Sequence, residues 1–227
     1  MTFPLFVFPE NAKFGRVVPK SKIYAHSNPS KRLRKLFVDQ VEQIVWQYKL
    51  APETINIPAR PPVTEIQVFD VELRTQEVSE DVLRCIDRSI PYPIFYRVSF
   101  GDKIKSIAAY KRPSDADSTK WVVDLYFETP WQSNRVGDEA EEKRLPLPIA
   151  LDIPSLYQQM LQLHIERPPR TGESFTDLIE RIRVLRQKKS EVTKLEARIG
   201  KEKQFNRKAD LNSQLQSLQR ELESLES

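Results

Sequence analysis

The stretch that decides how this chain is organised is GESFTDLIERIRVLRQKKSEVTKLEARIGKEKQFNRKADLNSQLQSLQRELESLES, residues 172–227. It contains no proline and only one internal glycine, Gly200, and its apolar residues are spaced three and four apart. This spacing places apolar side chains on one face of a helix. The segment therefore predicts long helix with a large exposed surface, which is suited to contact with another molecule.

Two apolar seams run along this arm. The first comprises Leu178, Ile182, Leu185, Val192, Leu195 and Ile199. The second comprises Leu211, Leu215, Leu218, Leu222 and Leu225. At 100° per residue the second seam begins about 120° away from the first, so the register breaks near Gly200. Two arrangements bury both seams, an antiparallel helical hairpin or a continuous helix that dimerises as a coiled coil.

Positive charge is concentrated in the middle of the arm. Between Arg181 and Lys208 there are eleven Lys and Arg residues against three Glu, and both flanks are acidic. Such clusters attract acidic proteins or nucleic-acid phosphates, although a basic helical face is often only solvated. Phe205 is the one aromatic residue among them, so we favour a protein partner. The candidate contact residues are Lys188, Lys189, Arg198, Lys201, Lys203, Gln204, Asn206, Arg207 and Lys208.

A second basic group lies at the start of a predicted helix that follows Ser30. Lys31, Arg32, Arg34 and Lys35 occupy its first turns, where the helix dipole disfavours positive charge. These side chains therefore call for an anionic neighbour. It is either a carboxylate of the same domain or a bound partner, and we include the four residues among the candidate binding residues.

The preceding part of the chain predicts a compact α+β domain. Alternation, helix caps and turn residues predict the elements. They are helices over 31–50, 79–89 and 154–165, strands over 65–74, 92–100, 103–111 and 120–128, and a loop over 129–153. We therefore expect a small mixed or antiparallel sheet of about four strands with flanking helices over residues 1–170. The helical arm then occupies residues 171–227.

Composition narrows the function classes. A single cysteine, Cys85, excludes an internal disulfide and every multi-thiolate metal site, and His26 and His164 stand in unrelated contexts. The apolar run at the start is about six residues long, too short for a signal peptide, and no later run approaches the ~20 residues of a membrane span. We expect a cytoplasmic protein that uses neither membrane, metal nor cofactor.

The side chains that could take part in catalysis match no specific catalytic motif. Asp70 and Glu72 share one face of a predicted strand and could combine with Asp124, Lys105 and Lys111. Metal-dependent nucleases hold carboxylates and a lysine on adjacent strands, where the metal activates water. Here no Glu-x-Lys doublet lies on a strand, and no phosphate-binding loop or nucleophile elbow is present. We therefore assign no catalytic residue and interpret these side chains as a solvated sheet face.

Several separated phrases resemble one known family. They are VEQIVWQYKLAPETINIP (41–58), EIQVFDVEL (65–73), CIDRSIPYPIFYRV (85–98), AAYKR (108–112) and KEKQFNRKADLN (201–212). Together they resemble domain-of-unknown-function family 4391, an uncharacterised bacterial family, over nearly the whole chain. The resemblance implies no activity and no catalytic residues. It does imply that the gene lies beside genes for helicases and DNA methyltransferases in bacterial restriction and defence clusters.

Our leading hypothesis is a non-catalytic accessory or assembly subunit of a DNA-processing or phage-defence complex. Its expected partner is a larger subunit, a helicase or a DNA methyltransferase, with DNA or RNA as a further candidate and a homodimer through the arm as another arrangement. The alternative hypothesis is a metal-dependent nuclease that uses Asp70, Glu72, Asp124 and Lys105.

Overall fold

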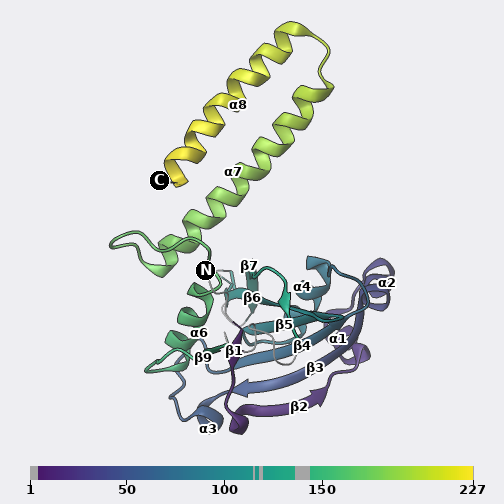
Figure 1. Cartoon of the computed structure of the whole chain (residues 1–227), viewed down its shortest axis with the longest axis vertical. Helices are drawn as coiled ribbons and strands as arrows, with labels where there is room; N and C mark the ends of the chain where they lie inside the picture. Colours follow the sequence, from purple (N-terminus) through teal and green to yellow (C-terminus); the bar gives the residue numbers. More distant parts are fainter. Residues whose placement is uncertain (1–4, 115, 118–119, 136–143, 227) are drawn as a thin grey trace. The chain divides into compact units, whose positions relative to one another are not determined.

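The computed structural model describes residues 5–114, 116–117, 120–135 and 144–226. It divides into two compact units, Met1–Glu166 and Arg167–Ser227 (Figure 1). The first unit combines a sheet with helices and the second contains the long C-terminal helices. The α+β class expected from the sequence is confirmed. Residues 1–4 of the opening run and 136–143 of the expected loop lie outside the described ranges.

A mixed seven-stranded sheet forms the centre of the first unit. Its strand order is β2-β3-β4-β5-β6-β7, and β8 pairs with β6. The β4–β5 pair is parallel and the other pairs are antiparallel. The strands are β2 (Lys13–Val17), β3 (Val41–Leu50), β4 (Ile66–Leu73), β5 (Ile94–Phe100), β6 (Lys103–Pro113), β7 (Trp121–Glu128) and β8 (Gln132–Ser133). Separately, β1 (Phe6–Val7) pairs in parallel with β9 (Leu145–Pro146).

The four expected strands are present as β4 to β7, but the sheet is larger than expected. The turn at Gly101 and Asp102 joins β5 to β6 as the sequence indicates, with Gly101 at a φ of 57°. Strands β2 and β8 were not expected, because each is short and shows no clear alternation. They extend the sheet through pairing with strands that are distant in sequence.

The predicted helix over 31–50 is wrong in its second half. The helix α2 (Lys31–Gln40) begins at the predicted Ser30 cap, and the chain then passes directly into β3 at Val41. Apolar residues in this half fit a helical period, but they include Val45, Trp46 and Tyr48, which also favour strands. Pairing on both edges, with β2 and β4, decides in favour of strand.

Three helices cover one face of the sheet. Residues of α1 (Lys20–Ser27), α2 and α4 (Glu80–Ser89) share a buried core with Phe69, Val71, Tyr96 and Val98 of the sheet. The short elements η1 (Glu10–Ala12) and α3 (Pro52–Ile55) lie in connections.

The helix α6 (Ile153–Gln162) packs on the opposite face. It begins at the Asp152 cap, and its Tyr157 meets the ring of Phe95 edge-on at 6.1 Å. Because Phe95 and Tyr96 are consecutive strand residues, they face opposite sides of the sheet. The core therefore has two layers of helix around one sheet.

The second unit is an antiparallel helical hairpin. The helix α7 (Phe175–Lys201) begins at the Ser174 cap and ends one residue after Gly200, and α8 (Phe205–Glu226) follows after three residues (Figure 1). An ion pair between Lys189 and Glu226 at 2.9 Å joins the two helices. Of the two arrangements compatible with the seams, the chain therefore adopts the hairpin. Over the described ranges, no helix combines the length and apolarity that crossing a membrane would require.

Candidate functional site

The end of the hairpin at which α7 leads into α8 carries unpaired positive charge. We call residues 194–208 the hairpin tip. Six of its cations are exposed, and none of them forms an ion pair with any described residue. They are Lys194, Arg198, Lys201, Lys203, Arg207 and Lys208. Five of the six were predicted from the sequence as contact residues, and the sixth, Lys194, was not.

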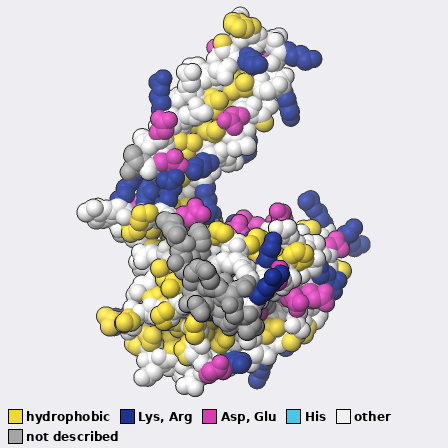
Figure 2. Space-filling model, viewed as in Figure 1, with side chains coloured by type: hydrophobic (Ala, Val, Ile, Leu, Met, Phe, Trp, Pro, Cys, Tyr) yellow, Lys and Arg dark blue, Asp and Glu magenta, His cyan; other side chains and the backbone are white. Residues whose placement is uncertain are grey.

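An aromatic side chain lies among these cations. Phe205 is 84% exposed, and Gln204 and Asn206 beside it are exposed as well. Glu202 is the carboxylate of the connection, and it accepts the backbone N–H groups of Gln204 and Lys203, each at 2.9 Å. These bonds hold its pKa below the ordinary value. The hairpin tip thus presents an exposed apolar ring together with cations. Figure 2 shows hydrophobic and Lys or Arg side chains at this end of the hairpin.

Two of the predicted contact residues act within the hairpin instead. Lys188 of α7 pairs with Glu221 of α8, and Lys189 pairs with Glu226. Near the start of α7, Arg181 binds Glu173 at 2.6 Å and holds the pKa of that carboxyl near 2. The basic run identified in the sequence therefore has two parts. One part joins the helices, and the part at the tip forms no ion pair with a described residue.

The second basic group retains free cations in the first unit. Lys31, Arg32 and Lys35 are exposed on α2, and no described carboxylate pairs with any of them. Arg34 differs, since its Nε donates to the Pro29 carbonyl at 3.2 Å and its guanidinium lies 5.4 Å from the Tyr24 ring. A carboxylate of the same domain, one of the two alternatives for these residues, does not form an ion pair with Lys31, Arg32 or Lys35 within the described part of the chain.

The carboxylates of the nuclease hypothesis are occupied by arginines. Asp70 of β4 accepts two hydrogen bonds of 2.6 Å from Arg97 of β5, which lies opposite it in register. Asp124 of β7 pairs with Arg112 at 2.7 Å. Lys105, the expected lysine of the site, pairs with Glu128 at 2.6 Å. These are ordinary cross-strand ion pairs on a sheet surface.

The sheet also keeps these carboxylates apart. Strands β5 and β6 lie between Asp70 on β4 and Asp124 on β7, which corresponds to about 14 Å at the usual strand spacing. Glu72 is exposed on β4. Among the described residues, no three His, Cys, Asp or Glu side chains are grouped so that they could hold a metal ion. The residues do not fit a shared metal centre.

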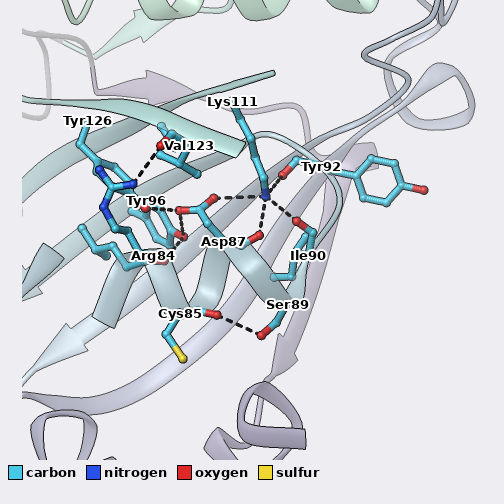
Figure 3. Close-up of polar contacts among 12 residues, drawn as sticks. Arg84, Cys85, Asp87, Ser89, Ile90, Tyr92, Tyr96, Lys111, Val123 and Tyr126 are labelled. Atoms are coloured by element: carbon cyan, nitrogen blue, oxygen red, sulfur yellow. Dashed lines mark hydrogen bonds and ion pairs between the residues drawn. The ribbon is translucent and has the colours of Figure 1, made fainter. Parts of the chain in front are cut away.

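Lys111, which the sequence placed on the same solvated face, is inside the protein. Its side chain and that of Asp87 are each 1% exposed, with Nζ 3.4 Å from the carboxylate (Figure 3). Lys111 Nζ also donates to the backbone carbonyls of Asp87 at 2.6 Å, of Ile90, and of Tyr92 at 3.0 Å. It therefore caps the C-terminal end of α4, where carbonyl groups need donors and the dipole favours a cation.

Two tyrosines complete this buried cluster. The hydroxyl groups of Tyr96 and Tyr126 donate to Asp87 Oδ2 at 2.9 and 2.6 Å. Burial raises the pKa of Asp87, against the opposing effect of Lys111 and the two hydroxyls, and burial lowers the pKa of Lys111. Because its polar groups satisfy one another, the cluster fixes the end of α4 to three strands. One feature of the sequence could have indicated this cluster, an aspartate beside Ile86 on the apolar face of a helix.

Two further reactive side chains, His164 and Cys85, are also internal. His164 is 3% exposed, its Nε2 lies 2.7 Å from Ser106 Oγ, and its Nδ1 lies 2.9 Å from the Met160 carbonyl. Nδ1 therefore carries the proton, Nε2 accepts from the hydroxyl, and desolvation lowers the pKa of the ring to about 4. Cys85 is buried, with Sγ 3.0 Å from Ser27 Oγ, which confirms it as a core residue.

The comparison with known families bears on both units. The family described as a domain of unknown function, DUF4391, matches residues 6–222. The chain belongs to this family. The DUF4391 match covers the sheet and most of the hairpin, so the hairpin is part of what defines the family. No curated protein and no solved structure matches the chain.

Proposed function

We propose that this chain is a non-catalytic accessory subunit of a bacterial DNA-processing or defence complex. In this proposal the hairpin tip binds a larger protein subunit, a helicase or a DNA methyltransferase. The observation that carries the proposal is the tip itself, where an aromatic ring that is 84% exposed lies among six cations.

The chemistry of the tip supports an acidic protein surface with an apolar pocket. Burying an exposed phenylalanine side chain contributes roughly 1.5–3 kcal/mol, and aromatic and arginine side chains are the commonest energetic centres of interfaces. The cations add attraction at a distance, which speeds encounter with an acidic surface. DNA or RNA is the second candidate partner, since phosphates would satisfy the same cations. A second copy of the chain would have to bring acidic groups to the tip.

The nuclease alternative has less support. Asp70 and Asp124 are each bound by an arginine, so neither carboxylate is available to a metal unless its ion pair opens. Cleavage of DNA or RNA by the pure protein with magnesium or manganese, lost in Asp70→Ala and in Glu72→Gln, would establish the alternative. The proposal expects no cleavage by the wild-type protein.

The proposal is tested by affinity purification of the tagged full-length chain from its native host, with nuclease treatment to remove nucleic acid. The test variant carries Lys201→Glu, Lys203→Glu, Arg207→Glu and Lys208→Glu, and the matched control carries K201R, K203R, R207K and K208R. We expect the wild type and the control to retain a helicase or methyltransferase and the test variant to lose it. Equal recovery with the test variant would refute the role of the tip.

A further inference from the structure

An open groove of about 360 Å³ lies in the first unit, apart from every residue discussed so far as a binding candidate. Its floor comes from β2, β3 and β4, and its walls come from α1 and from the chain that follows α4. Ligand sites in proteins typically begin at about this volume. The side chains that define it are Phe14, Arg16, Lys22, His26, Trp46 and Tyr92.

Two partly exposed aromatic rings, Phe14 and Trp46, form the floor of this groove, and Phe69, which is 1% exposed, packs against Trp46. Trp46 is stacked on Phe69 with 6.2 Å between ring centroids and 7° between ring planes, and Phe14 lies 4.1 Å from Trp46. A β-bulge at Gly15, whose φ is +64°, lies between Phe14 and Arg16. Such bulges redirect neighbouring side chains, and this one leaves the Arg16 guanidinium 4.5 Å from the Phe14 ring.

Two cations and a histidine border the aromatic floor. Arg16 comes from β2, and Lys22 and His26 come from α1, with all three exposed. None of them has an ion-pair partner among the described residues, and no Asp or Glu belongs to the described lining. Positive charge beside flat apolar surface, without an internal counterion, favours a ligand that is both planar and anionic.

The wall of the groove is held rigidly. Lys111 binds the carbonyls of Ile90 and Tyr92 from inside the sheet, and the hydroxyl of Ser89 donates to the Ile23 carbonyl of α1 at 3.1 Å. Figure 3 shows the Tyr92 ring pointing away from the buried cluster that anchors its backbone. The groove is therefore preformed, and a ligand would not need to order it.

We propose that this groove binds a nucleotide within single-stranded nucleic acid, with the base against the aromatic floor and the phosphates on Arg16 and Lys22. Aromatic platforms flanked by cations are how proteins hold single strands without reading sequence. A single strand suits the site better than a free mononucleotide, because the cations stand on separate elements along an open groove. A duplex hides the faces of its bases. The inference goes beyond the proposed function, since the groove and the hairpin tip lie in different units.

Binding is measured by fluorescence anisotropy of a labelled oligothymidylate strand with the full-length chain. The test variant carries Arg16→Glu and Lys22→Glu, and the matched control carries Arg88→Glu and Lys103→Glu, two exposed cations outside the groove. We expect the test variant to bind about ten-fold more weakly or worse, with a salt dependence reduced by about 1.4 in logarithmic slope, and the control to resemble the wild type. The hairpin-tip charge-reversal variant should keep this binding.

The fluorescence of Trp46 tests whether the single-stranded nucleic acid lies in the groove. Stacking of a base should quench the fluorescence of Trp46, and this quenching should be lost in Trp46→Phe, which keeps an aromatic ring on Phe69. Equal affinity in the test and control variants, or no binding by the wild type, would overturn the proposal. Equal competition by duplex DNA or by thymidine monophosphate would also overturn it. Loss of binding only in the tip variant would assign nucleic acid to the hairpin instead.

Discussion

Acidification should destabilise the first unit through one buried imidazole. His164 is neutral in the folded protein because desolvation lowers the pKa of its ring from 6.5 to about 4. In the unfolded chain the ring takes up a proton below about pH 6.5. The unfolded state then binds more protons than the folded state, so stability that is present above pH 6.5 is lost as the pH falls towards 4.

The magnitude follows from these two pKa values. Each pH unit inside the window changes the free energy of unfolding by about 1.36 kcal/mol per proton, so roughly 2 kcal/mol is lost by about pH 5. Nearly the whole of a ~3.4 kcal/mol effect is reached below about pH 4. The carboxyls with lowered pKa values, such as Glu173 and Asp152, begin to titrate only near the acidic end. Burial raises the pKa of Asp87, so the protonation of this carboxyl favours the folded state as the pH falls and opposes the effect of His164.

Urea unfolding at a series of pH values measures this effect. All three tryptophans, Trp46, Trp121 and Trp131, belong to the first unit, so their fluorescence reports the unit that contains His164. We expect the loss of stability on acidification from about pH 6.5 to pH 5 to disappear in His164→Gln and to persist in His26→Gln, which alters the only other histidine. Equal pH slopes in the wild-type protein and in H164Q would rule out His164 as the cause.

Three further predictions follow from the contacts. Lys111→Met leaves the Asp87 carboxylate buried without its cation and should cost about 3–5 kcal/mol in urea unfolding, and a loss below about 1 kcal/mol would contradict the buried pair. Phe205→Ser should change the free energy of unfolding by less than about 0.5 kcal/mol while reducing capture of the partner, and unchanged capture would remove the ring from the interface. Lys188→Glu opposes Glu221 and should lower hairpin stability modestly, by up to about 1 kcal/mol in thermal melts followed by circular dichroism, without loss of capture. Lost capture with an intact hairpin would extend the contact surface beyond the tip.

Local patterns in the sequence predicted the elements whose conformation is decided locally. Strand β4 follows from its β-branched and aromatic residues, β5 and β7 from alternation, and β6 from the turn at Gly101 and Asp102. The helix α4 follows from the Ser79 cap, and the break near Gly200 follows from apolar spacing, which left the hairpin and the coiled-coil dimer as alternatives. Strand β3 could not be predicted in this way, because its apolar residues fit both periods. Its conformation depends on partners supplied by residues 13–17 and 66–73.

The candidate sites show the same difference between features that are local in the sequence and features that depend on distant residues. A run of lysines and arginines is visible in the sequence, so the basic hairpin tip was predicted, but which cations are paired depends on how α7 and α8 align. The pairing of Lys188 with a residue 33 positions away is an example. The buried bond from Lys111 to Asp87 spans 24 positions, and the one from Ser106 to His164 spans 58. Contacts of this kind arise only when strands and helices pack.

Site-specific crosslinking tests the central claim most directly. A photoreactive phenylalanine analogue is placed at position 205 of the full-length chain in the native host, and at Ile149 of the first unit, which is 96% exposed, as a matched control. We expect position 205 to crosslink to a helicase or DNA methyltransferase subunit and position 149 not to do so. A partner that crosslinks from position 149 but never from position 205 would contradict this expectation.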